Sequence, residues 1–161
     1  MAGNAALYEE DFYAWTVEQS QLLRSGEFSQ LDVENIVEEL ESMGRSDRRE
    51  IESRLTVLLA HLLKWQVQIG FGSSSWSATI REQRDRIQDL LSESPSLRPV
   101  ADSPRPALYA RARRAAADET GLSEAAFPAS CPFKSEQILA EDFLPEGGDR
   151  RVGGAGRRVR S

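Results

Sequence analysis

The residues that could do chemistry in this chain gather in one stretch, from Leu31 to Ile69. Glu34, Glu38 and Glu41 are separated by four and then three residues, which places them on one face of a helix. Paired carboxylates can hold a hard metal ion, or one of them can act as a general base beside a neighbour. The same residues also suit a solvated acidic face, on which Glu41 pairs with Arg45 four residues later. The spacing favours the solvated face and leaves the site as the alternative.

His61 is the only histidine in the chain. It follows Glu41 at a distance of about 30 Å along a straight helix, so the two meet only in an antiparallel dimer or in a hairpin at Gly44. We therefore treat Glu38, Glu41 and His61 as candidate catalytic residues and predict that the helix self-associates. The simpler role for His61 is at the edge of the core, hydrogen-bonded to a backbone carbonyl. No Glu-x-x-His pair occurs, so we expect no metal centre and no other cofactor.

A second candidate site lies where this stretch gives way to the next helix. Five residues there could bind a ligand: Lys64, Trp65, Trp76, Arg81 and Arg84. If the two helices are antiparallel, the tryptophan rings come close and the arginines can stack on them. Such a rim would hold an anion or an aromatic ligand. The alternative is that the rings belong to the core and the arginine stems cover them.

Cys131, the single cysteine, precedes Pro132 in an expected loop. A thiol nucleophile needs a base and a lowered pKa, and only His61 offers an imidazole. We therefore predict that Cys131 is structural. The chain also has no recognisable nucleophile elbow, phosphate-binding glycine motif or zinc-type cysteine and histidine spacing.

The elements that position these residues are helices, because no useful length of sequence alternates with period two. The apolar spacing predicts helices over about residues 7–24, 30–69, 75–93, 107–119 and 135–142. Gly26 should end the first, and a capping box at Ser29 should begin the second. The fold class is therefore all-α, a bundle of four to five helices. Its long central helix, straight or bent at Gly44, should be packed through the apolar stripe from Leu40 to Leu63.

The composition predicts a single helical domain over residues 1–146 and a disordered Gly/Arg-rich tail over 147–161. The tail has one aspartate and five arginines, a net charge of +4, which leaves −10 on the rest of a chain whose total is −6. An acidic body argues against nucleic acid as its ligand. Weak contact with nucleic acid is expected only through the tail arginines, Arg150, Arg151, Arg157, Arg158 and Arg160.

The chain shows no apolar run near the roughly 20 residues that span a bilayer, so we expect no membrane partner. Its first residues lack the basic start and apolar region of a secretory signal. With one cysteine, no internal disulfide can form. These features favour a cytoplasmic location.

Eight short segments, taken in order, resemble a known family. They are Asp11-Phe12-Tyr13-Ala14-Trp15, Glu38-Glu39-Leu40-Glu41-Ser42-Met43-Gly44, Leu62-Leu63-Lys64-Trp65, Ser75-Trp76, Gln83-Arg84, Ser94-Pro95-Ser96-Leu97, Glu119-Thr120-Gly121-Leu122 and Cys131-Pro132. The chain is similar over about residues 7–145 to the bacterial family called domain of unknown function 29. That resemblance implies an all-helical fold and no particular activity. The family's linker before Ser75-Trp76 is typically basic, whereas residues 70–74 here carry no charge.

The leading functional prediction is a non-enzymatic protein-interaction or assembly module that forms a homo-oligomer through helix faces. The alternative is a metal- or small-anion-dependent enzyme or binding module that uses Glu38, Glu41 and His61. The two differ in where these side chains lie: convergence in a cleft favours the enzyme, and dispersal over solvent favours the interaction module.

Overall fold

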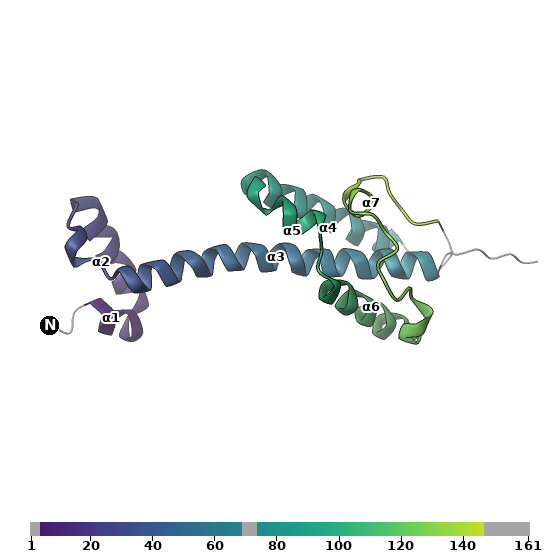
Figure 1. The fold of residues 1–161 in the computed structure, drawn as a ribbon, viewed down its shortest axis with the longest axis horizontal. Helices are drawn as coiled ribbons and strands as arrows, with labels where there is room; N and C mark the ends of the chain where they lie inside the picture. The colour runs from purple at the N-terminus through teal and green to yellow at the C-terminus, as the bar shows by residue number, and fades with distance from the viewer. Residues whose placement is uncertain (1–3, 69–73, 147–161) are drawn as a thin grey trace, which may run out of the picture. The chain divides into compact units, whose positions relative to one another are not determined.

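The computed structural model describes residues 4–68 and 74–146 (Figure 1). Within these ranges every regular element is helical and none is a strand, which confirms the all-α prediction. The chain divides into two compact units, Met1–Asp47 (unit 1) and Arg48–Ser161 (unit 2). The single domain over residues 1–146 stays a prediction. The tail over 147–161, with its five arginines, lies outside the described residues.

Helix α3, Val33–Val67, confirms the long helix, and it runs through Gly44 without interruption. It begins three residues later than the predicted capping box would place it. Residues Phe28–Gln30 form a 3₁₀ turn, and Leu31 is extended at φ −66° and ψ 140°. Ser29 therefore belongs to the turn, and the helix starts after Asp32.

The first predicted helix, over residues 7–24, is instead two helices, α1 (Asn4–Glu10) and α2 (Phe12–Ser25). Asp11 separates them with non-helical backbone at φ −150° and ψ 86°, and its side chain accepts a hydrogen bond from Ala14 N at 3.0 Å. This is the geometry of an N-cap, so Asp11 starts a new helix within the apolar pattern. Gly26 ends α2 in the left-handed region at φ 74°, as predicted.

In the described part of unit 1, the buried residues are Trp15 and Gln19. Both contact Asp32: Trp15 Nε1 donates to its carboxylate at 3.0 Å, and Gln19 Oε1 accepts from its backbone N at 2.9 Å. Tyr8 adds a hydrogen bond from its hydroxyl to Glu39 at 2.6 Å. Unit 1 is therefore held largely by polar contacts and by the edge-to-face packing of Tyr8 on Trp15.

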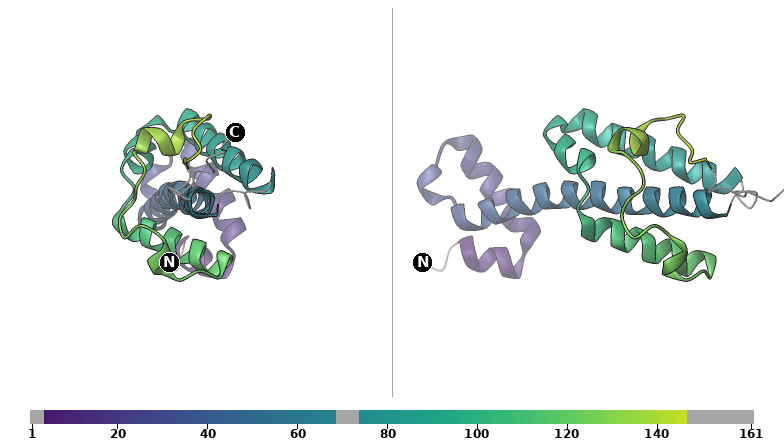
Figure 2. Two further views of the ribbon diagram at one scale, coloured as in Figure 1. Left: turned by 90° about the vertical axis from the view of Figure 1, so that its right-hand side faces the viewer. Right: turned by 45° about the vertical axis from the view of Figure 1, so that its right-hand side comes forward.

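Unit 2 is built around the part of α3 that follows Asp47 (Figures 1 and 2). Two long helices flank it, and two short ones complete it: α4 (Ser74–Glu93), α5 (Arg98–Asp102), α6 (Pro106–Thr120) and α7 (Ser135–Leu139). The end-on view in Figure 2 shows α3 between α4 and α6. The helices predicted over 75–93 and 107–119 are confirmed. The last helix is shorter than predicted, and the backbone N of Lys134 before it bonds to Gln137 Oε1 at 2.9 Å.

The core of unit 2 confirms the predicted stripe from Ile51 onward. The α3 side chains that are fully buried are Ile51, Leu55, Leu58, Leu59, Leu62 and Leu63. The prediction was wrong at Leu40, which is 62% exposed. The reason is length: α3 has 35 residues and α4 only 20, about 52 Å against 30 Å, so α4 is too short to cover the whole stripe.

Candidate functional site

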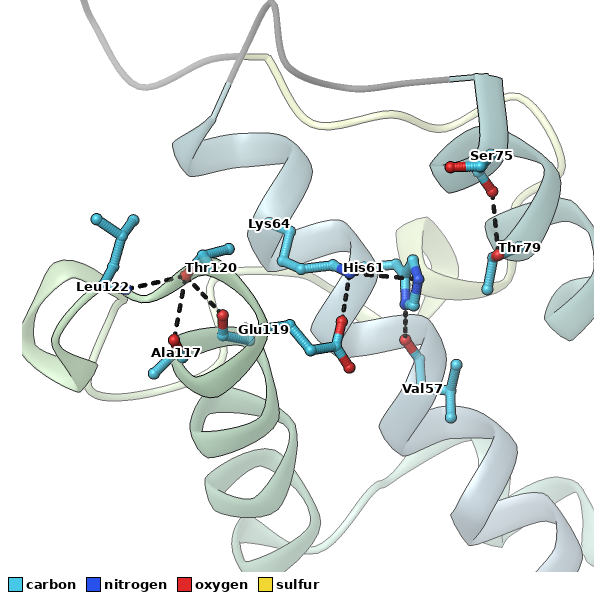
Figure 3. Close-up of polar contacts among 10 residues, drawn as sticks. Val57, His61, Lys64, Ser75, Thr79, Ala117, Glu119, Thr120 and Leu122 are labelled. Atoms are coloured by element: carbon cyan, nitrogen blue, oxygen red, sulfur yellow. Dashed lines mark hydrogen bonds and ion pairs between the residues drawn. The ribbon is translucent and has the colours of Figure 1, made fainter.

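Lys64 is the centre of a polar cluster in unit 2 (Figure 3). It lies one turn after His61 on α3, near Trp76 in the first turn of α4 and Glu119 at the end of α6. Helices α3, α4 and α6 thus each place one charged or aromatic side chain beside the Lys64 ammonium. Lys64 itself is buried, with 4% of its surface exposed.

The Lys64 ammonium has three partners. It forms an ion pair with Glu119 Oε2, it lies 3.4 Å from His61 Nε2, and it stands 4.7 Å from the centre of the Trp76 ring. Two of these partners can accept hydrogen bonds from the ammonium, and the Trp76 ring adds a cation–π contact. A buried cation is tolerated only when it is compensated in this way.

His61 is held by its other nitrogen. Nδ1 lies 2.9 Å from the carbonyl of Val57, and because a carbonyl only accepts, Nδ1 carries the proton. Nε2 is then free to accept from Lys64. Burial lowers the pKa of His61, and the positive charge of Lys64 lowers it further, while the bond to Val57 raises it. The imidazole is therefore neutral, at the edge of the core and bonded to a backbone carbonyl, as its simpler predicted role required.

Helix α6 ends one residue after Glu119, at Thr120. Thr120 donates from its hydroxyl to the carbonyl of Ala116 at 2.7 Å, and it accepts from the backbone N of Leu122 at 3.3 Å. Gly121 terminates the helix in the left-handed region at φ 71°. The Glu119 side chain stays half-exposed, at 50%, while Lys64 opposite is enclosed. Glu119 is thus the solvent-facing member of the pair.

The polar groups of the cluster bind one another: Lys64 pairs with Glu119, and the Nε2 lone pair of His61 faces the lysine. The geometry suits a polar connection among α3, α4 and α6, which is a role in holding the helices in register.

The five residues of the predicted ligand site do not all lie together in the structure. Lys64 and Trp76 meet, but Trp65 is half-buried and packs against the apolar core. Arg84 is 2% exposed and donates to the carbonyls of Ile138, Gln137 and Glu141 at 2.9, 3.3 and 3.2 Å. These bonds hold α7 and the segment directly after it against α4.

Arg81 is exposed and shares a cavity with Arg84. Three carboxylates line the same cavity: Asp85, Glu141 and Asp142. The acids outnumber the two guanidinium groups, so this cavity is a poor place for an anion.

Glu38 and Glu41 lie in unit 1, with side chains 57% and 63% exposed. Both pair with Arg45, at 2.9 Å and 3.7 Å. This is the solvated face that the spacing favoured. The described residues contain no group of three histidine, cysteine or acidic side chains that could hold a metal ion. The approach of His61 to these carboxylates in a second copy stays a prediction.

Cys131 is half-buried against the core and donates to the carbonyl of Phe133 at 3.5 Å. Burial raises the pKa of its thiol, while the bond to Phe133 lowers it. A protonated thiol suits the structural role that was predicted.

Sequence reasoning missed Glu119 as a partner of Lys64. The two are 55 residues apart, and nothing local in the sequence links them. The available signal was that both belong to segments that carry the family resemblance, as does Trp76. Three of those eight segments meet at this cluster.

Comparison with known proteins confirms the family resemblance. The family model described as "Domain of unknown function DUF29" matches residues 7–144. The chain belongs to this family. No curated protein and no solved structure matches it. The DUF29 description assigns no activity, so the function of this DUF29 protein has to be argued from its own residues. Among its described helices, none combines the length and hydropathy needed to cross a membrane.

Proposed function

We propose that this DUF29 protein is a non-enzymatic assembly module of the cytoplasm, and that it self-associates through an apolar face of unit 1. The observation that carries the proposal is the distribution of exposed apolar side chains. Eleven large apolar residues are exposed in the described chain, and nine belong to unit 1. They are Phe12, Tyr13, Val17, Leu23, Phe28, Val33, Val37, Leu40 and Met43.

Four of these residues lie on α3 and, with half-buried Ile36, form what we call the α3 stripe. The stripe is defined by Val33, Ile36, Val37, Leu40 and Met43, whose outermost members are 58% and 65% exposed. Positions 33, 36, 40 and 43 are separated by three, four and three residues, the spacing of a coiled-coil seam. Contiguous apolar patches of several hundred Å² on a monomer mark interaction sites. The stripe has the form of a helix seam without its second helix.

A second copy of the same stripe is the partner that fits best, because a seam with this spacing packs against another seam of the same kind. We propose an antiparallel pair, in which Val33 lies opposite Met43 and Ile36 lies opposite Leu40. Glu38 and Arg45, which are paired at 2.9 Å, lie on another side of α3 and do not set the direction.

Disulfide trapping tests both the face and its direction. In a Cys131→Ser background, one chain carries Val33→Cys and a differently tagged chain carries Met43→Cys. After mild oxidation of the mixture, the antiparallel pair predicts the mixed disulfide as the main product. A Val33→Cys chain that couples to itself instead would show parallel pairing and overturn the direction. No cross-link in any mixture would overturn the proposal.

The matched control is Glu38→Cys in the same background. Position 38 is 57% exposed, and five residues after Val33 it lies on another side of the helix. It should cross-link no faster than random collision allows. Trapping at position 38 as fast as at position 33 would mean that the cross-links report encounter and not a specific face.

A further inference from the structure

Unit 2 contains a cavity of about 320 Å³ that no part of the proposed assembly uses. Leu59 of α3 lines it, together with the loop before α6, the first turns of α6 and the segment 124–131. The volume is at the lower end of the range for small-molecule sites. At about 30 Å³ for each water, it corresponds to roughly ten water-sized groups.

Most of the wall is apolar. Leu59, which is fully buried, contributes to it together with Pro104, Pro106 and Tyr109. The Tyr109 hydroxyl is already engaged, donating to the carbonyl of Pro128 at 2.6 Å. These groups would contact the hydrocarbon part of a ligand and would add few polar requirements.

The arginines that line the cavity are not all paired with a carboxylate. Arg114 has a partner, because it lies 3.6 Å from Glu124. Arg113 has no ion pair in the described part of the chain, and its Nη2 donates only to the carbonyl of Phe127 at 3.2 Å. Its Nε is enclosed by protein and has no hydrogen-bond partner among the described residues, so a ligand would meet the outer nitrogens of the guanidinium. A guanidinium that lines a mostly apolar cavity without an ion pair favours an anion delivered by a ligand.

We propose that this cavity binds a small monocarboxylate with an apolar body, and that its carboxylate pairs with the Arg113 guanidinium. Arginine presents several N–H donors in a plane and matches the two oxygens of a carboxylate. The apolar wall then selects against small hydrophilic anions. This site is independent of the α3 stripe, so either proposal can fail while the other stands.

Cys131 gives a direct readout, because it lines the cavity and is the only thiol in the chain. The probe is octanoate, with octanol as its uncharged counterpart of equal length. Octanoate at low millimolar concentration should slow alkylation of Cys131 by iodoacetamide several-fold at mildly alkaline pH. Octanol should give little protection. Equal protection by both would show apolar partitioning alone and overturn the carboxylate assignment.

Two charge variants and calorimetry complete the test. Arg113→Gln should abolish protection, Arg113→Lys should retain part of it, and Arg114→Gln should leave it intact. Circular dichroism checks that each variant is folded. Calorimetric titration of the unaltered protein with octanoate should show saturable heat at one site per chain. Absence of both heat and protection, or protection that persists in Arg113→Gln, would overturn the proposal.

Discussion

At the scale of single residues, Lys64 is the most unusual feature, because it is a charged side chain inside the core of unit 2. A lysine almost never reaches 4% exposure without compensation, and here Glu119, His61 and Trp76 supply it. The Lys64–Glu119 pair should therefore contribute more than an exposed ion pair. Its half-exposed carboxylate is screened by solvent, which limits the contribution.

We predict that Glu119→Gln destabilises the protein by about 1–2 kcal/mol, because a buried ammonium loses its charged partner. The measurement is urea unfolding followed by circular dichroism. The matched control is Asp102→Asn, which breaks the Arg98–Asp102 pair, where both side chains are about half-exposed. That change should cost less than about 0.5 kcal/mol. Equal effects of the two substitutions would contradict the role given to Lys64.

His61 predicts a pH dependence of stability. Its pKa is lowered in the folded state, so the unfolded state binds the proton more readily. The stabilisation is fully present above the unfolded pKa near 6.5 and is lost as pH falls from there through the lowered folded pKa. His61→Gln removes this titration. Unfolding free energies of the two proteins should therefore converge on acidification, whereas a constant difference between pH 7.5 and 5 would contradict the assignment.

The sequence was informative at this scale about His61 and Cys131, whose predicted surroundings depend on their own helix or loop. It was uninformative about Glu119 and about the role of Arg84. Both act across long separations, and a guanidinium that binds backbone carbonyls leaves no pattern in side-chain types. The spacing of Glu38 and Glu41 with Arg45 is local, and there the expected solvated face matches their exposure.

At the scale of elements, α3 is the feature that the sequence predicted best. Its apolar residues repeat with helical spacing on both sides of Gly44, and the helix is continuous through it. The break at Asp11 was not predicted, because the apolar spacing of residues 7–24 crosses it. An N-cap depends on one side chain and one backbone turn, which periodicity does not detect.

Gly44 and Gly26 provide a matched pair of element-scale variants. A Cβ at Gly44 meets nothing within 4 Å, so Gly44→Ala should stabilise the protein by about 0.5–1 kcal/mol through helix propensity. Gly26 ends α2 at φ 74°, where a side chain is strained, and Gly26→Ala should destabilise by about 1 kcal/mol. Thermal unfolding shows whether each substitution raises or lowers the stability of the protein. Destabilisation by Gly44→Ala would indicate that α3 needs flexibility at that position.

At the scale of the whole molecule, the two units differ in how they bury apolar surface. Unit 2 contains almost the entire hydrophobic core, whereas Trp15 is the only buried apolar residue in the described part of unit 1. A segment of that size buries too little surface to be stable by itself. Association would supply what unit 1 lacks. The sequence predicted self-association of the long helix, but it could not indicate which part of the stripe would face a second copy, because a seam that faces a second copy has the same spacing as one that faces the core.

The central claim is that the α3 stripe is covered by a second copy, and molar mass by light scattering tests it most directly. At tens of micromolar the protein should have about twice the mass of one 18.0 kDa chain. Leu40→Glu places a charge at an exposed position, so it should leave the helices intact and reduce the mass to that of one chain. Leu122→Glu, at a 36% exposed leucine of unit 2, should leave the dimer unchanged. A single-chain mass for the unaltered protein, or a dimer that persists in Leu40→Glu, would contradict the account.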